Sequence, residues 1–262
     1  MSDSQLRVER PHDGVVLLTL DNPDQRNAMS APVTAAWRRT TTELGADPDL
    51  RAVVVTGAGS AFCSGGDVSW IGSEPDASVA DLRARMLPFY RDWLSVLDLE
   101  VPTIAAINGP AIGAGLCLAL ACDLRFAAND ARLAAPFVQL GMHPAMAATW
   151  LLPDVVGAAH ARDLLLTGRT VDAAEALRIG LVSRVVEPDR LLEEALEAAV
   201  AIAATAPVAS RLLTRALRNG HASLEAAVQW EALAQPATLA TADLREGLEA
   251  ARGRRTPRFT GR

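Results

Sequence analysis

Short apolar runs alternate with small-residue turns and helical stretches over the first half of the chain. Val15–Leu20 is apolar and β-branched and precedes Asp-Asn-Pro, so it predicts a strand that enters a turn. Ser30 and Pro32 then open a stretch with helical spacing that runs to Leu44. Arg51–Thr56 predicts a buried strand that ends in a glycine-rich loop.

The same order of elements recurs further along the chain. A second helix is predicted near Leu82–Leu97, and a strand over Thr103–Asn108 follows it. The turn Gly109–Gly115 then leads into a helical run, Leu116–Ala121, and Asp123–Ala128 predicts another strand. Because buried strand, small-residue loop and helix occur twice in this order, the pattern favours an α/β fold.

From Pro188 onward the pattern is helical. Three stretches are rich in Ala, Leu, Glu and Arg at helical spacing: Leu191–Ala204, Val208–Asn219 and Leu224–Ala250. We therefore expect two parts, a core over residues 1–200 and a helical C-terminal region over residues 201–262. The tail, Arg252–Arg262, is basic and contains proline, and we expect a partner to order it.

The composition excludes several kinds of chemistry. Of 262 residues half are hydrophobic, the formal net charge is −6, and every Lys or Arg position is arginine. Without lysine the chain has no Schiff-base lysine, P-loop lysine or lysine general base. The acidic balance disfavours nucleic acid as a partner, because nucleic acid rewards clustered basic faces.

Cysteine usage and apolar run lengths bear on the cellular compartment. Cys63, Cys117 and Cys122 show no metal-ligand spacing, and their odd number suits no complete disulfide framework, so we expect no metal site. The first ten residues lack the apolar centre of a signal peptide, and Ile104–Leu120 is interrupted by polar residues and proline. We expect a cytoplasmic protein without a membrane partner.

Two small-residue loops, Gly57–Asp67 and Asn108–Gly115, each follow an apolar strand. Residues without bulk let backbone N–H groups approach a ligand, and two such loops side by side present one N–H each to a single oxygen. An enolate or tetrahedral oxyanion needs this arrangement. Two alternatives stand beside it: tight turns that allow close strand–helix packing, and a dinucleotide-binding loop, although the glycine spacing is not G-x-G-x-x-G.

In the same order along nearly the whole chain, these loops and further motifs resemble those of the crotonase (enoyl-CoA hydratase/isomerase) superfamily. The matching segments are Asn22–Met29, Thr56–Asp67, Pro102–Asp123, Leu166–Val182 and Pro257–Arg262. The resemblance implies a spiral of ββα turns with a C-terminal helical trimerisation region, in a homotrimer or a hexamer built as a dimer of trimers. It also implies an acyl-CoA thioester substrate and no cofactor beyond its CoA moiety.

The resemblance assigns roles to individual positions. The backbone N–H groups of Gly66 and Ala114 would form the oxyanion hole. Contacts with CoA are expected from Arg26, Asn27, Ala28, Ser64, Gly65, Gly66, Asp67, Val68, Ala114 and Phe259. Among these, Arg26 is the expected phosphate contact, and Phe259 is expected to reach the ligand of a neighbouring subunit.

The sequence departs from the family where hydratases carry two glutamates, because Cys117 and Phe137 occupy those positions. Those carboxylates hold and activate the water that adds to the double bond, so we expect weak hydration here. Ala145 stands where dienoyl isomerases and acyl-CoA hydrolases carry a carboxylate. The leading hypothesis is an enoyl-CoA hydratase/isomerase-family lyase or isomerase. The alternatives are a decarboxylase of malonyl-type thioesters and a non-catalytic acyl-CoA-binding protein.

Few titratable side chains remain for the chemistry. His143 is the best placed, with a suitable unperturbed pKa, although a hydrogen-bonded histidine at a strand-to-helix turn is the favoured interpretation. Cys117 is a candidate nucleophile or a small residue that fills the place of the glutamate. Glu74, Tyr90 and Asp92 lie near the segment that covers the acyl pocket in the family, where a polar side chain would replace the lost base or belong to a solvated helix face.

Overall fold

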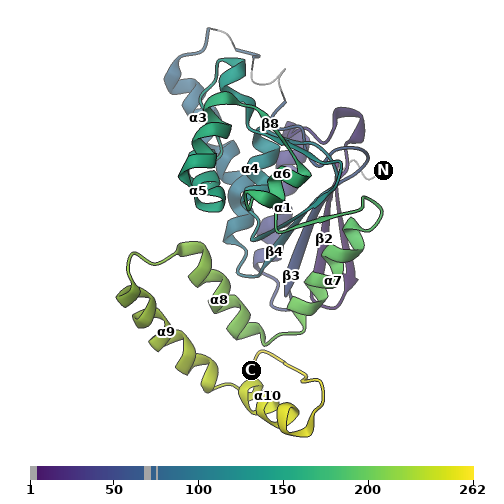
Figure 1. Ribbon diagram of the computed structural model, residues 1–262, viewed down its shortest axis with the longest axis vertical. Helices are drawn as coiled ribbons and strands as arrows, with labels where there is room; N and C mark the ends of the chain where they lie inside the picture. Colours follow the sequence, from purple (N-terminus) through teal and green to yellow (C-terminus); the bar gives the residue numbers. More distant parts are fainter. Residues whose placement is uncertain (1–4, 68–71, 75) are drawn as a thin grey trace.

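The computed structural model describes residues 5–67, 72–74 and 76–262, and Figure 1 shows a sheet with covering helices from which a helical extension projects. The larger sheet has the order β1 (Leu6–His12), β2 (Val15–Leu20), β3 (Ala52–Gly57), β4 (Thr103–Ile107), β6 (Leu124–Ala128) and β9 (Arg184–Val186). Only the β1–β2 pair is antiparallel among these neighbours. A smaller sheet joins β5 (Ala111–Ile112), β7 (Arg132–Ala134) and β8 (Thr170–Asp172).

Both faces of the central strands are buried, which explains their continuous apolar sequences. Val54 and Ile104, paired in register, pack in the cluster that contains the inner residues of α7 (Leu191–Ala203). Val53 and Val55 belong to the opposite cluster, which includes residues of α1 (Ala31–Gly45), α3 (Val79–Leu94) and α4 (Ala114–Leu120) and of two later helices. The α/β layering expected from the sequence is therefore confirmed.

Several elements follow no pattern that the sequence analysis recognised. β1 is an exposed edge strand with charges and a proline, and the strands of the smaller sheet have two or three residues. Helix α5 (Ala148–Thr167) contains Pro153 and bends at Gly157, where φ is +75°. The remaining short elements are α6 (Ala173–Arg178), η1 (Pro23–Gln25), η2 (Ser95–Asp98) and η3 (Pro136–Leu140).

Three helices extend away from the sheet at the lower end of Figure 1: α8 (Pro207–Asn219), α9 (Leu224–Leu239) and α10 (Ala242–Gly253). The stretch predicted as helical over Leu224–Ala250 is interrupted between α9 and α10 because the hydroxyl of Thr241 caps the N–H of Leu244 at 3.3 Å. The predicted boundary between residues 200 and 201 falls inside α7. Among the described residues no single helix is long and apolar enough to cross a membrane, and α7 with α8 meets that test only as a pair bent by 114°.

The expectation that a partner orders the C-terminal tail is wrong for its last residues. Asp243, which is 3% exposed, accepts hydrogen bonds from the N–H groups of Thr260 and Gly261 at 2.7 and 2.8 Å. Glu246 accepts another from the N–H of Arg258 at 2.7 Å. Two carboxylates on α10 thus satisfy backbone donors of the tail within the same chain, a pairing that sequence spacing alone does not show.

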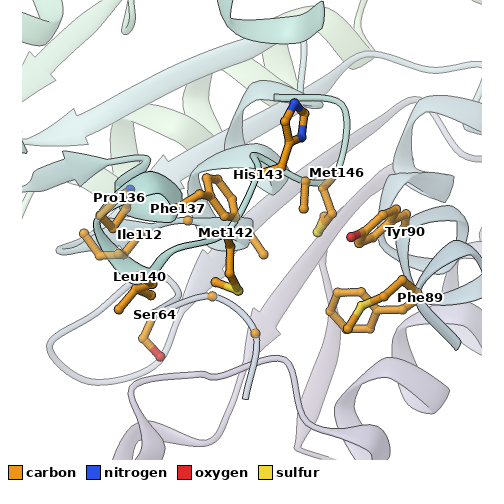
Figure 2. Close-up of a pocket in the computed structure, with 16 residues that line it drawn as sticks. Ser64, Phe89, Tyr90, Ile112, Pro136, Phe137, Leu140, Met142, His143 and Met146 are labelled. Carbon is orange, nitrogen blue, oxygen red and sulfur yellow. The ribbon is translucent and has the colours of Figure 1, made fainter. Parts of the chain in front are cut away.

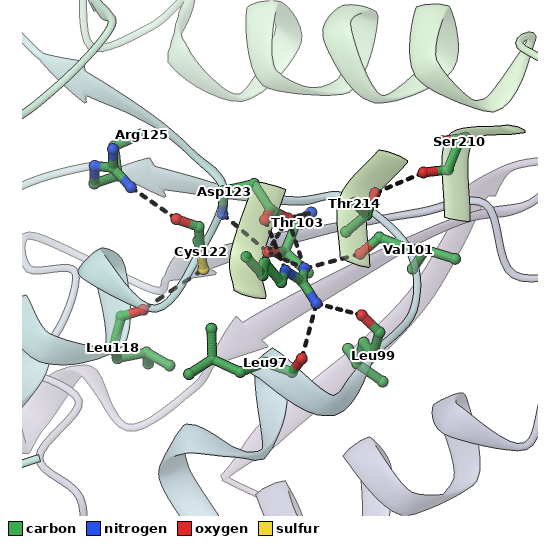
Figure 3. A network of polar contacts seen from close by, with 11 residues as sticks. Leu97, Leu99, Val101, Thr103, Leu118, Cys122, Asp123, Arg125, Ser210 and Thr214 are labelled. Atoms are coloured by element: carbon green, nitrogen blue, oxygen red, sulfur yellow. Dashed lines mark hydrogen bonds and ion pairs between the residues drawn. The ribbon is translucent and has the colours of Figure 1, made fainter. Parts of the chain in front are cut away.

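Arg218 ties α8 to the sheet (Figure 3). Its guanidinium pairs with Asp123 at 2.6 Å and donates to the carbonyls of Leu97, Leu99 and Val101. The Arg218 side chain is 13% exposed, so these acceptors replace the water that the charge loses. One arginine therefore fixes where the helical extension leaves the core.

Candidate active site

Two loops at the carboxyl ends of β3 and β4 meet at the wall of a pocket. The first loop covers residues 57–67, and the second runs through β5 into α4. They pair as parallel backbone at Cys63 and Ala111, where the N–H of Ile112 donates to the carbonyl of Cys63 at 3.0 Å. The structure thus brings together the two small-residue loops that the sequence analysis singled out.

Glycine is needed where the loops approach each other. Gly65 has φ +96°, and a Cβ on it would lie 2.7 Å from the carbonyl oxygen of Ile112 and 3.3 Å from the nitrogen of Ala114. A Cβ on Gly115 would overlap the carbonyl of Cys63. Close packing, the first alternative raised for these loops, is therefore present whether or not they hold a ligand.

The backbone N–H groups of Gly66 and Ala114 are available to a ligand. Both residues line the pocket, and neither N–H donates a hydrogen bond to any residue that the structure describes. Gly66 follows the crossing of the loops, whereas Ala114 is the first residue of α4. Donors without internal partners in such a pocket can stabilise negative charge on an oxygen.

The pocket itself is a largely apolar cavity of about 250 Å³ (Figure 2). Its walls come from α3, from the loops just described, from η3 and from the turn that precedes α5. The side chains on these walls belong to Ser64, Met86, Phe89, Tyr90, Ile112, Ala114, Pro136, Phe137, Leu140, Met142, His143, Ala145 and Met146. None of these lining residues is Asp or Glu. The sequence analysis did not single out the three methionines, which have no motif of their own.

Neither Cys117 nor Phe137, the positions where the resemblance expects glutamates, presents a carboxylate to the pocket. The Phe137 ring lines the pocket beside Gly113, 7% exposed. Cys117 is 1% exposed, and its thiol donates to the carbonyl of Ala145 at 3.5 Å. Burial raises the pKa of the Cys117 thiol to about 12, so the thiol stays neutral and is not an activated nucleophile.

His143 borders the pocket but is exposed. Its Nδ1 lies 2.7 Å from the carbonyl oxygen of Pro144, which can only accept, so Nδ1 is the donor of this hydrogen bond. In Figure 2 the ring projects away from the side chains of Met142 and Phe137. His143 is therefore a histidine hydrogen-bonded at a turn, and its Nε2 remains available for other contacts.

The three other polar candidates have different surroundings. Asp92 pairs with Arg38 at 3.4 Å, and Glu74 pairs with Arg85 at 2.9 Å. Neither carboxylate lines the pocket. Tyr90 does line it, and Figure 2 shows its hydroxyl directed toward Met146.

The residues expected to contact CoA fall into separate groups. Arg26 is exposed, adopts the left-handed conformation and pairs with no carboxylate in the described part of the chain, while its carbonyl accepts from the N–H of Ser64 at 2.9 Å. Asn27 is 1% exposed, and its amide donates to the carbonyls of Ala58 and Ala61, so its side chain braces the loop.

Two further expected contacts lie elsewhere. Val68 lies outside the described residues. Phe259 packs beside Gly247 of α10 and lines a hollow among α8, α9 and α10 rather than the apolar pocket of its own chain.

Comparison with known proteins gives one consistent answer. The model of the family described as enoyl-CoA hydratase/isomerase matches residues 10–262. A probable enoyl-CoA hydratase of Mycobacterium bovis is 38% identical over the full length of both chains, and a putative enoyl-CoA hydratase of Thermus thermophilus is 38% identical over 97% of this chain and 100% of its own. The crystal structure of an enoyl-CoA hydratase from Bacillus anthracis superposes with a TM-score of 0.93 at 34% identity, covering 98% of this chain and 100% of that one.

Proposed function

Because this chain belongs to the enoyl-CoA hydratase/isomerase family, whose members process acyl-CoA, we propose that it holds the thioester carbonyl oxygen between the N–H groups of Gly66 and Ala114. The observation that carries this proposal is that both donors lack partners in the described chain and border the same apolar pocket. A thioester carbonyl placed there gains negative charge as an enolate forms. Loss of one such donor typically raises a barrier by about 3 kcal/mol.

Water addition is expected to be slow. In a hydratase the paired carboxylates orient the water and move its proton, and here a phenyl ring and a neutral thiol occupy those places. Ala145 presents only a methyl group to the pocket. The enzyme therefore acts on the thioester through enolate stabilisation rather than through a carboxylate base.

Decarboxylation of a malonyl-type thioester is the second candidate. The absence of Asp and Glu from the described pocket lining favours it, because an oxyanion hole accepts the electron pair left by departing CO₂ without a general base. Isomerisation needs a group that moves a proton, and the candidates for it are His143 and Tyr90. Arg26, exposed beside the first loop and without an acidic partner in the described chain, is the proposed contact for a CoA phosphate.

The test is a panel of enoyl-, malonyl- and saturated acyl-CoA thioesters incubated with the protein in heavy water, with the products weighed by mass spectrometry. Water addition, deuterium uptake, CO₂ loss and thioester cleavage each change the mass differently. We expect the wild type to change the mass of at least one thioester. Ala114→Pro should abolish this reaction, whereas Ala114→Gly, which keeps the N–H, should retain it. Binding of every thioester with no change in any would instead support a non-catalytic acyl-CoA-binding protein.

A further inference from the structure

The hydroxyl of Tyr90 is a polar group in the pocket to which enolate stabilisation by Gly66 and Ala114 gives no role. Tyr90 is the one tyrosine of the chain and sits on α3, next to Phe89. The two rings meet edge to face at 6.1 Å, and Phe89 lies 6.5 Å from Trp93. Trp93 in turn stacks on Trp37 at 5.0 Å. This aromatic packing therefore fixes the position of the Tyr90 ring.

The hydroxyl group itself has no hydrogen-bond partner among the described residues, although the side chain is half-buried. In Figure 2 it points toward the side chain of Met146. A thioether is a weak acceptor, so Met146 does not satisfy the donor. A polar group half removed from water gains most from a partner that a ligand supplies.

The surroundings of the Tyr90 hydroxyl keep it protonated, so it remains a hydrogen-bond donor. Burial, and after it the nearby Cys117, raise the pKa of Tyr90 above its ordinary value of 10.0, so the phenol is neutral at physiological pH. The lining contains no Lys or Arg, and the ring in contact with Tyr90 is that of Phe89. A purely alkyl acyl chain would leave the hydroxyl unpaired.

We infer that Tyr90 selects acyl-CoA thioesters whose acyl group carries a second oxygen, which accepts a hydrogen bond from the phenolic O–H. The inference rests on the proposed function, because the thioester carbonyl must occupy the Gly66 and Ala114 donors for the rest of the acyl group to reach α3. The oxygen belongs either to an uncharged hydroxyl or to a carboxylate, and the two sources are separated by experiment.

Dissociation constants are measured by calorimetry for butyryl-CoA, 3-hydroxybutyryl-CoA and malonyl-CoA with the wild type and with Tyr90→Phe, which keeps the ring. We expect the variant to bind at least one oxygenated thioester about 3- to 10-fold more weakly, the usual effect of a neutral hydrogen bond. Butyryl-CoA binding should change by less than about twofold, the range of independent effects. The thioester that responds identifies the source of the oxygen.

Ser183→Ala is the control, because it removes an exposed hydroxyl that donates to the carbonyl of Arg125 and does not line the pocket. It should leave the ratio of oxygenated to butyryl-CoA affinity unchanged. If Tyr90→Phe shifts the affinity for all three thioesters equally, or for none, the inference is overturned while the proposed function stands. If the wild type binds none of the three, the proposed function fails and the selection by Tyr90 fails with it.

Discussion

The side chains of Cys117 and Phe137 occupy the places where, by family resemblance, a hydratase carries its two glutamates. The sequence predicts both replacements and weak hydration from the resemblance alone, and both stay predictions. It left open whether Cys117 acts as a nucleophile, and the structure answers this through burial. Side-chain burial depends on contacts between segments far apart in the chain, such as the one between Cys117 and Ala145, which local patterns do not report.

Restoring the carboxylates should restore hydration. We expect the double variant Cys117→Glu/Phe137→Glu to hydrate crotonyl-CoA at least about 100-fold faster than the wild type, since a positioned acid–base pair contributes on that scale. The measurement is the loss of enoyl absorbance over time. The double glutamine variant matches the size without the proton chemistry and should stay slow. A folded double glutamate variant as slow as the wild type would show that more than these two groups is missing.

The buried thiols predict a loss of stability in alkali. Burial raises the pKa of Cys63, Cys117 and Cys122 to about 12 from a reference of 9.0. Their contribution is complete below about pH 9 and disappears as the pH rises toward 12, because the unfolded chain then releases protons that the folded chain retains. Urea unfolding at a series of pH values measures this slope, and Cys122→Ala should reduce it. Rapid alkylation of native Cys117 at neutral pH would contradict the account.

At the scale of elements, β2, β3, β4, β6 and the helices α1, α3 and α4 were predictable from apolar runs and helical spacing, whereas the three-residue strand β9 was not. The order of strands was not, since register comes from pairs such as Val54 with Ile104. Helix α5 escaped prediction because Pro153 and Gly157 interrupt its pattern. The loops were located from their small residues, but their crossing at Cys63 and Ala111 is visible only in three dimensions.

The crossing of the two loops makes Gly65 sensitive to substitution. Gly65→Ala would place a methyl group against Ile112 and beside the nitrogen of Ala114 at a positive φ. We expect acyl-CoA affinity to fall about tenfold or more, because displacement of a donor by about 1 Å has large effects. Gly45→Ala is the control, since no atom lies within 4 Å of its added Cβ. Unchanged affinity in Gly65→Ala would mean that the loop crossing does not position the donors.

At the scale of the whole molecule, the match to the enoyl-CoA hydratase/isomerase family confirms the crotonase resemblance and the fold class. The division into a core and a helical C-terminal region stays a prediction, as does assembly into a homotrimer or hexamer. Leu213, Leu217, Leu224 and Leu233 are exposed on α8 and α9, which suits an assembly that covers them. The ties of the C-terminal region to the core were not predictable, because Arg218 and Asp123 are far apart in sequence.

Removal of the Arg218 side chain should strongly lower the stability of the fold. Arg218→Ala leaves Asp123 without its cation and three carbonyls without their donor, so we expect the free energy of unfolding to fall by about 3–5 kcal/mol. Arg215→Ala, on the same helix, breaks an exposed pair with Glu100 at 3.6 Å and a cation–π contact with Trp230 at 5.8 Å; it should cost about 1 kcal/mol. Urea denaturation compares the two, and equal losses would contradict the role given to Arg218.

The most direct test of the central claim is the infrared frequency of the thioester carbonyl in ¹³C-labelled butyryl-CoA, free and bound. Two backbone donors polarise the carbonyl, so its stretch should move to lower frequency on binding to the wild type. The shift should persist in Ala114→Gly and shrink in Ala114→Pro, where proline at the first position of α4 removes one donor without breaking the helix. A bound carbonyl that vibrates at its solution frequency in the wild type would contradict the oxyanion hole.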